Sequence, residues 1–278
     1  MSSVKQDKKG LESDHQGDRR FATTLARGLS VLRAFRASDD GLGNQEIAER
    51  TGLPKSTVSR LTFTLQALGY LTHEGRRDRY RLGPSLLALG NVATASMSFV
   101  EVGSPIMQNL ANETGTLVVL AVRDERKLLL VKTWRPRGVS SIWLETGHRI
   151  PVKGSSSGHA LLAALSDSEF EEVAAYLEGE NGLTIDMART LRNEAYADLV
   201  SVGHVIAQPE IRFAATVNAV AVPFRSYELT EPVIFTCGAL PKDLTDARMQ
   251  EEVGPKLRAA VRELERATGQ SPVLAQRG

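Results

Sequence analysis

The feature of this sequence that most constrains its fold is a pair of short helical patterns separated by a tight turn. The first pattern covers residues 45–50, and the second begins at Pro54, a residue favoured at the first position of a helix. Gly52 lies between them, where helices commonly end in a left-handed residue. This spacing is typical of a helix-turn-helix, whose second helix can enter the major groove of DNA.

The elements around this pair complete a predicted winged helix-turn-helix domain over residues 21–83. A helix over residues 23–35 comes first, and its apolar residues at helical spacing are Leu25, Leu29, Leu32 and Phe35. The second helix of the pair ends at Gly69. Its predicted buried stripe consists of Val58, Leu61, Leu65 and Leu68. Two short strands, over residues 70–72 and 80–82, then flank a charged turn.

The residues expected to contact double-stranded DNA are cations and small hydroxyl residues of this domain. They are Arg27, Lys55, Ser56, Thr57, Ser59, Arg60, Arg76, Arg77 and Arg79. Short hydroxyls permit close approach to base edges, while cations bind phosphates and guanine. Residues 1–83 hold 15 Lys and Arg against 10 Asp and Glu, a balance that suits a polyanion. A helical bundle with solvated charged faces is the alternative, and the full order of elements favours DNA.

A linker helix is predicted over residues 84–100, beginning at Pro84. Its apolar residues are Leu86, Leu87, Leu89 and Val92. One recognition helix reads only a few base pairs, so useful specificity usually needs two half-sites and a dimer. The apolar stripe is a candidate dimer surface, although it could equally pack within one subunit.

Residues 101–270 alternate between strand and helix patterns. Predicted strands cover residues 117–122, 127–134, 141–144, 205–206, 217–224 and 233–237. Predicted helices cover residues 104–113, 158–165, 168–177, 187–200 and 245–267. Strand hairpins at both ends, with helices grouped between them, predict an α+β domain with a mainly antiparallel sheet.

A glycine–serine loop between a strand and a helix is the other unusual segment. It reads Gly154-Ser155-Ser156-Ser157-Gly158. Backbone N–H groups at the start of a helix, helped by three hydroxyls, suit a carboxylate. An ordinary serine cap on a flexible loop competes nearly evenly with this interpretation on physical grounds alone.

The same loop matches the G-x-S-x-G nucleophile elbow of hydrolases. Such an enzyme would need an acid and a histidine downstream, and His204 is the histidine that could reach Ser156. The sequence lacks the HGGG-type oxyanion loop and the run of parallel strands that the fold requires. We therefore predict no catalytic residues and no enzyme activity.

Composition narrows the remaining possibilities. Cys237 is the single cysteine, so no internal disulfide can form, and no ligand spacing indicates zinc. We expect neither a metal nor another cofactor. The polar start, residues 1–20, is predicted to be a disordered tail, and the apolar runs are too short to cross a membrane. These observations predict a cytoplasmic protein.

Residues 24–83 resemble the DNA-binding half of the IclR family of bacterial regulators. The matching stretches include LARGLSVL at residues 25–32 and EIAERTGLPKSTVSRL at residues 46–61. Residues 69–71 and 80–83 complete the pattern, and a weaker resemblance continues to Gly269. The resemblance implies a GAF-like effector-binding domain and dimers that pair further on DNA.

The resemblance also implies an effector pocket beside the glycine–serine loop. Its expected lining is Val139, Ile142, Ile150, Ser155, Ser156, Ser157, Gly158, Val217, Ala219, Phe235 and Cys237. Cys237 replaces the family's usual serine, and Glu210 alone fits a place where many members carry paired acids. These departures predict a less polar pocket and a small organic acid as ligand, aromatic acids included.

Two further interpretations remain beside an effector-responsive regulator. One is a hydrolase built on Ser156. The other is an architectural DNA binder whose affinity for DNA responds to no metabolite.

Overall fold

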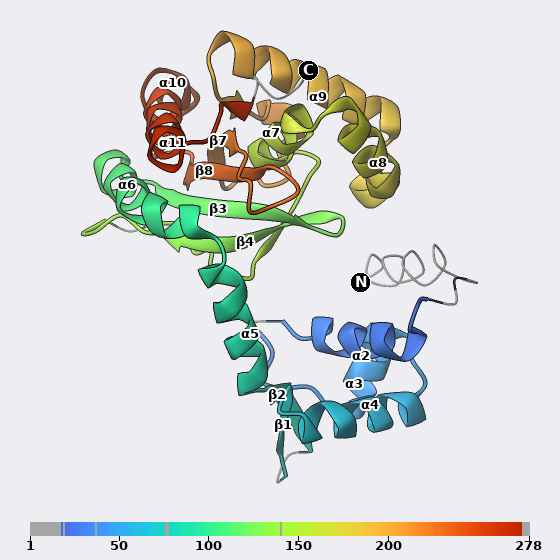
Figure 1. Cartoon of the computed structure of the whole chain (residues 1–278). Coiled ribbons are helices and arrows are strands. Elements are labelled where there is room, and N and C mark those ends of the chain that lie inside the picture. The colour runs from blue at the N-terminus through green and yellow to red at the C-terminus, as the bar shows by residue number, and fades with distance from the viewer. Residues whose placement is uncertain (1–17, 19, 37, 76–77, 140, 274–278) are drawn as a thin grey trace. The chain divides into compact units, whose positions relative to one another are not determined.

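The computed structural model describes residues 18, 20–36, 38–75, 78–139 and 141–273. The chain divides between Ser96 and Met97 into two compact units. Figure 1 shows the elements of each unit. The fold class predicted from the sequence is confirmed, since a helix-turn-helix unit precedes a unit built from helices and an antiparallel sheet.

The first unit is a winged helix-turn-helix. Its elements are α2 (Thr23–Arg33), α3 (Asn44–Thr51), α4 (Lys55–Ala67), β1 (Leu71–Glu74), β2 (Arg79–Leu82) and α5 (Pro84–Ala95). Strands β1 and β2 pair as an antiparallel hairpin. A bridge between Leu42 and Tyr80 joins this hairpin to the segment before α3. The turn between α3 and α4 contains Gly52 at φ 70°, the left-handed residue expected there.

The core of this unit is built from residues of every element except α5. Its buried apolar residues are Val31, Leu42, Ile47, Ala48, Val58, Leu71 and Tyr80. The predicted buried stripe of α4 needs one correction, because Leu68 follows the end of the helix and is 60% exposed. Thr62 is buried instead, and its hydroxyl donates to the Val58 carbonyl at 3.0 Å.

Helix α5 is apolar but has no core-facing side in its own unit. None of its residues, all of which lie in the described ranges, is buried. Leu87, Leu89 and Val92 are each more than half exposed. Over the part of the chain that the structure describes, no single helix is long and apolar enough to cross a membrane. Helix α5 and the following helix, α6 (Ser98–Thr114), meet that test only when counted together.

The second unit contains a six-stranded sheet in which every neighbouring pair is antiparallel. Its strands are β3 (Leu117–Asp124), β4 (Lys127–Trp134), β5 (Arg149–Pro151), β6 (Val205–Ile206), β7 (Asn218–Phe224) and β8 (Val233–Ala239). They lie in the order β5-β4-β3-β8-β7-β6.

The strand expected over residues 141–144 is not formed. The guanidinium of Arg135 donates to the carbonyls of Ile142 and Leu144 at 2.9 and 2.7 Å. The hydrogen bonds of these carbonyls thus go to a side chain and not to a neighbouring strand. The edge position beside β4 is taken by β5 instead.

Helices cover both faces of the sheet. They are α6 (Ser98–Thr114), α7 (Ser156–Ala164), α8 (Asp167–Leu177), α9 (Ile185–Ser201), α10 (Asp246–Arg248) and α11 (Gly254–Thr268). Short 3-10 helices cover Glu180–Gly182 and Pro209–Ile211, and a π-helical segment covers Met249–Val253. Leu117 and Val119 of β3 pack toward α7, α8 and α9, whereas Val118 and Leu120 pack toward α6 and α11. Helix α7 is buried along its whole length.

Candidate functional site

The outward face of α4 presents most of the residues expected to contact DNA. Lys55, Ser56, Ser59 and Arg60 are exposed, and Thr57 is half-buried. The ammonium of Lys55 donates to Oε1 of Gln45 on α3 at 3.1 Å. One exposed face of a helix thus gathers two cations and two hydroxyls, the side chains that reach into a major groove.

The arginines of the hairpin and of α2 that were expected to contact DNA differ in their surroundings. Arg79 donates to the Gly41 carbonyl at 2.9 Å and to Oε1 of Glu46 at 3.1 Å. Its guanidinium therefore holds the wing, the hairpin of β1 and β2, to the start of α3, and its contact with DNA stays a prediction. Arg27 is half-buried on α2. Arg76 and Arg77 lie outside the described residues.

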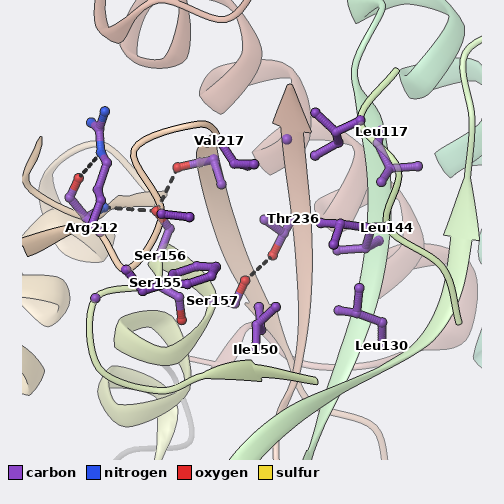
Figure 2. Close-up of a pocket in the computed structure, with 18 residues that line it drawn as sticks. Leu117, Leu130, Leu144, Ile150, Ser155, Ser156, Ser157, Arg212, Val217 and Thr236 are labelled. Atoms are coloured by element: carbon purple, nitrogen blue, oxygen red, sulfur yellow. Dashed lines mark hydrogen bonds between the residues drawn. The ribbon is translucent and has the colours of Figure 1, made fainter. Parts of the chain in front are cut away.

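The second unit contains a small cavity at the start of α7. The volume within which the centre of a water molecule can lie is about 50 Å³. Seven of the predicted residues line it: Ile142, Ile150, Ser155, Ser156, Ser157, Val217 and Ala219. Figure 2 places Leu117, Leu130 and Leu144 on one side of this space and the three serines on the other.

The strand alternation excludes two predicted lining residues. Ala219 of β7 lies opposite Gly238 of β8, and Val220 lies opposite Cys237. Opposite residues share a face, so Gly238 and Thr236 face the cavity, whereas Phe235 and Cys237 belong to the core under α6 and α11. The residues predicted from β8 were thus shifted by one position from those that line the cavity, and a shift of one residue along a strand moves a side chain to the other face of the sheet.

Two other predicted residues do not line the cavity either. Val139 is 56% exposed and does not contribute to it. At Gly158, a Cβ atom would come within 2.0 Å of the Val152 carbonyl oxygen. This glycine therefore allows α7 to pack closely on the preceding loop.

The three hydroxyls of the loop are all engaged within the protein. Ser155 caps α7 by accepting from the Gly158 N–H at 3.0 Å. Ser156 donates to the Ala219 carbonyl at 2.6 Å and accepts from the Ala207 N–H at 2.9 Å. Ser157 bonds the Thr236 hydroxyl at 2.8 Å. These serines join α7 to β7, β8 and the segment after β6, as the dashed lines for Ser156 and Ser157 in Figure 2 show.

This arrangement does not match a serine hydrolase. The Ser156 hydroxyl bonds two backbone groups, whereas a nucleophile needs a base as its partner. The Nε2 atom of His159 instead accepts from the Gly154 N–H at 3.2 Å. Burial lowers the pKa of His159 to about 4, so this imidazole is neutral at pH 7.

Sequence reasoning missed a larger part of the lining. The missed residues are Leu117, Val119, Leu130, Leu144, Gly154, Ala207, Arg212, Phe213, Ala214, Thr236 and Gly238. Period-two alternation along β3 and β8 could have found four of them, namely Leu117, Val119, Thr236 and Gly238. Nothing in the pattern around residues 207–214 indicates that this segment closes the cavity.

Arg212 alone is charged among the described residues that line the cavity. It donates to Oδ1 of Asn218 at 2.7 Å and to Oδ1 of Asp246 at 2.6 Å. The two partners of this ion pair differ in exposure to solvent, since the side chain of Arg212 is 12% exposed and that of Asp246 is 57% exposed. Arg212 is therefore a half-buried cation at the cavity's edge, and its carboxylate partner is open to water.

Cys237 is unsuited to sense redox state or hold a metal. It is fully buried, and burial raises the pKa of its thiol to about 12. It therefore packs as a small apolar side chain. Within the described ranges, no three His, Cys, Asp or Glu side chains are grouped to hold a metal ion.

Comparisons with known proteins agree with this two-part organisation. Residues 24–75 match the family model of the IclR helix-turn-helix domain, and residues 92–266 match that of the bacterial transcriptional regulator IclR C-terminal. The chain belongs to the IclR family. It is thus a DNA-binding transcriptional regulator and not an enzyme, and the resemblance seen in the sequence is confirmed.

Individual IclR relatives span most of the chain. An IclR family transcriptional regulator from Brucella abortus is 33% identical and covers 94% of this chain and 98% of its own, with a TM-score of 0.77. The regulator TsaQ1/TsaQ2 of Comamonas testosteroni is 28% identical over 87% of each chain. An IclR homologue from Microbacterium hydrocarbonoxydans, complexed with 4-hydroxybenzoate, shares the fold at 24% identity and a TM-score of 0.64, with 86% and 99% covered.

Proposed function

We propose that this IclR-family regulator binds a specific operator through α4, and that a small organic acid in the cavity of the second unit changes its affinity for that operator. The observation that carries the proposal is the cavity itself. It joins an apolar wall to the start of a fully buried helix. Apolar pockets with a few placed polar groups are the usual form of small-molecule sites.

The lining favours an acid with an apolar body. Seven leucine, isoleucine and valine residues contribute to the wall, and the described lining includes no carboxylate. The ligand's carboxylate is best matched by the first backbone N–H groups of α7, at Ser156 and Ser157, because such groups have no partner within the helix. The hydroxyls are poor candidates since each already bonds the protein. Arg212 adds a positive charge at the edge of the cavity, although its guanidinium already donates to Ala207, Asn218 and Asp246.

Aromatic acids are the class that we favour. An aromatic ring needs apolar surface around it, and the leucine, isoleucine and valine side chains of the lining supply it. The homologue that holds 4-hydroxybenzoate shows that a protein of this fold can hold such a ligand. The cavity is small, so we expect a single-ring acid or smaller.

We propose that the protein acts as a homodimer, pairing further on DNA, and reads a palindromic operator. One α4 helix covers only one half-site, and two-fold symmetry supplies the second. The exposed apolar side chains of α5 offer a surface for a second copy. Chromosomal DNA as the target places this action in the cytoplasm.

The experiment combines a melting-temperature screen with operator binding. Single-ring aromatic acids and short aliphatic acids are tested on the full chain, since a ligand raises the melting temperature by mass action. An acid that stabilises the protein should also shift operator affinity, by about 1–3 kcal/mol of coupling energy. A protein whose operator affinity responds to none of the stabilising acids would be a constitutive binder, contrary to the proposal.

A filled cavity provides the matched control. Ala219→Leu adds apolar atoms inside the cavity, whereas Val139→Leu adds them at an exposed position outside it. The first variant should lose both responses to the acid and keep ligand-free operator binding, and the second should keep both. Equal responses in the two variants would mean that the acid binds elsewhere.

A further inference from the structure

The outward face of α4 carries one large apolar side chain among its polar residues. Phe63 is 72% exposed, although phenylalanine is among the residues most often fully buried. It follows Ser59 by four residues and Arg60 by three, which places all three on one side of a helix. Phe63, Ser59, Arg60 and Thr64 line one shallow hollow.

The packing of the unit does not account for Phe63. The buried residues of α4 are Val58 and Thr62, on the side that faces the core. Successive residues of a helix turn by about 100°. Ser56, seven residues before Phe63, therefore lies on the same outward stripe. The exposed ring is continuous with the surface that carries the residues expected to read DNA.

We infer that Phe63 contacts the C5-methyl group of a thymine in the major groove and so helps to set the operator sequence. This inference rests on the proposed binding of an operator through α4. The major groove displays one apolar group, the thymine methyl, and phenylalanine is among the side chains that contact it. Contact with the methyl removes apolar surface of both partners from water.

The helix geometry also sets where this thymine lies. A helix rises about 1.5 Å per residue, so Phe63 lies about 4.5 Å beyond Arg60 along its axis. That is between one and two base-pair steps of about 3.4 Å. The thymine should therefore lie one or two base pairs from the base that Arg60 contacts, once in each half-site.

The test begins with a binding site selected from random double-stranded DNA by the full-length protein. Each thymine of the selected site is then replaced singly by deoxyuridine, which removes only the methyl group. At one position in each half-site, the replacement should weaken binding by roughly three- to fivefold, the factor for one lost methyl contact. Phe63→Ala should bind the selected site less tightly and should not distinguish thymine from uracil at that position. Phe63→Leu should retain part of the preference for thymine.

Leu68→Ala is the matched control, since Leu68 is an exposed apolar residue beyond the end of the same helix. This variant should retain the full preference for thymine. A selected site with no methyl-sensitive position, or equal sensitivity in wild type and Phe63→Ala, overturns the inference. A changed oligomeric state of Phe63→Ala in light scattering would also overturn it, by making the ring a contact between copies. Failure to select any site would instead count against the proposed operator.

Discussion

The two candidate sites of this regulator differ in how their residues are brought together. The proposed DNA-facing surface lies largely on a single helix, where residues 55–63 supply most of its proposed contacts. The cavity takes its lining from positions between Leu117 and Gly238, on five strands, one helix and the loops between them. A helix fixes its outward face by its own period, whereas a cavity depends on the pairing register of distant strands.

This difference has consequences for mutation. Residues on the face of α4 make few contacts within the protein, so their replacement should change DNA binding and leave stability almost unchanged. Residues around the cavity also hold elements together, so their replacement should change stability and ligand binding at once. The predictions below test that contrast.

The largest effect is expected at Ser156. In Ser156→Ala, the buried Ala207 N–H and the half-buried Ala219 carbonyl lose this hydrogen-bond partner. Unpaired buried groups cost about 1–3 kcal/mol each, so the free energy of unfolding should fall by roughly 2–6 kcal/mol. Trp134 and Trp143 both lie in the second unit, so tryptophan fluorescence during urea unfolding reports the change.

Ser168→Ala is the control for this substitution, because Ser168 is an exposed serine of the same unit. We expect it to change the free energy of unfolding by less than about 0.5 kcal/mol. A Ser156→Ala protein as stable as this control would mean that the hydrogen bonds of Ser156 do not stabilise the fold. The Ser156 hydroxyl would then be available to bind a ligand.

The next effect is a dependence of stability on pH, due to His159. Burial lowers its pKa in the folded state to about 4, while the unfolded chain keeps an ordinary value near 6.5. Between these values the unfolded state binds a proton that the folded state does not. Stability is therefore full above about pH 6.5 and falls by about 3 kcal/mol as the pH drops to about 4.

Replacing the imidazole isolates this contribution. His159→Gln keeps a group that can accept from Gly154, but it does not titrate, so its unfolding free energy should fall less steeply over that range. Part of the slope should remain, because burial also lowers the pKa of His204. The exposed His148→Gln is the control and should retain the wild-type slope. An unchanged slope in His159→Gln would show that this histidine does not titrate as expected.

The same contrast explains which features the sequence could predict. The helix-turn-helix follows from Gly52, Pro54 and the apolar period of two short helices, all within a few turns of chain. Lys55, Ser56, Ser59 and Arg60 were accordingly placed on the exposed face. Phe235 and Cys237 were assigned to the wrong face of β8, because its register with β7 is set by neighbours far along the chain. Arg212 was missed since its role arises from a loop that folds back against Gly154.

The smallest effect separates two arginines that look alike in the sequence. Arg60 lies on the exposed face of α4, and Arg79 is held by the Gly41 carbonyl and Glu46. Arg60→Ala should cost about 1–3 kcal/mol of operator binding if it makes a bidentate contact with guanine, with the melting temperature unchanged.

Arg79→Ala should instead lower stability, by about 1 kcal/mol or less, because its partners are partly open to water. Any loss of operator affinity should be smaller than in Arg60→Ala, since it would arise only through a loosened wing. Calorimetry measures the first quantity, and fluorescence anisotropy with labelled operator measures the second. If Arg79→Ala weakens operator binding as much as Arg60→Ala while its melting temperature is unchanged, Arg79 contacts DNA directly. The wing would then have to release Glu46 on binding, and the DNA-facing surface would extend beyond one helix.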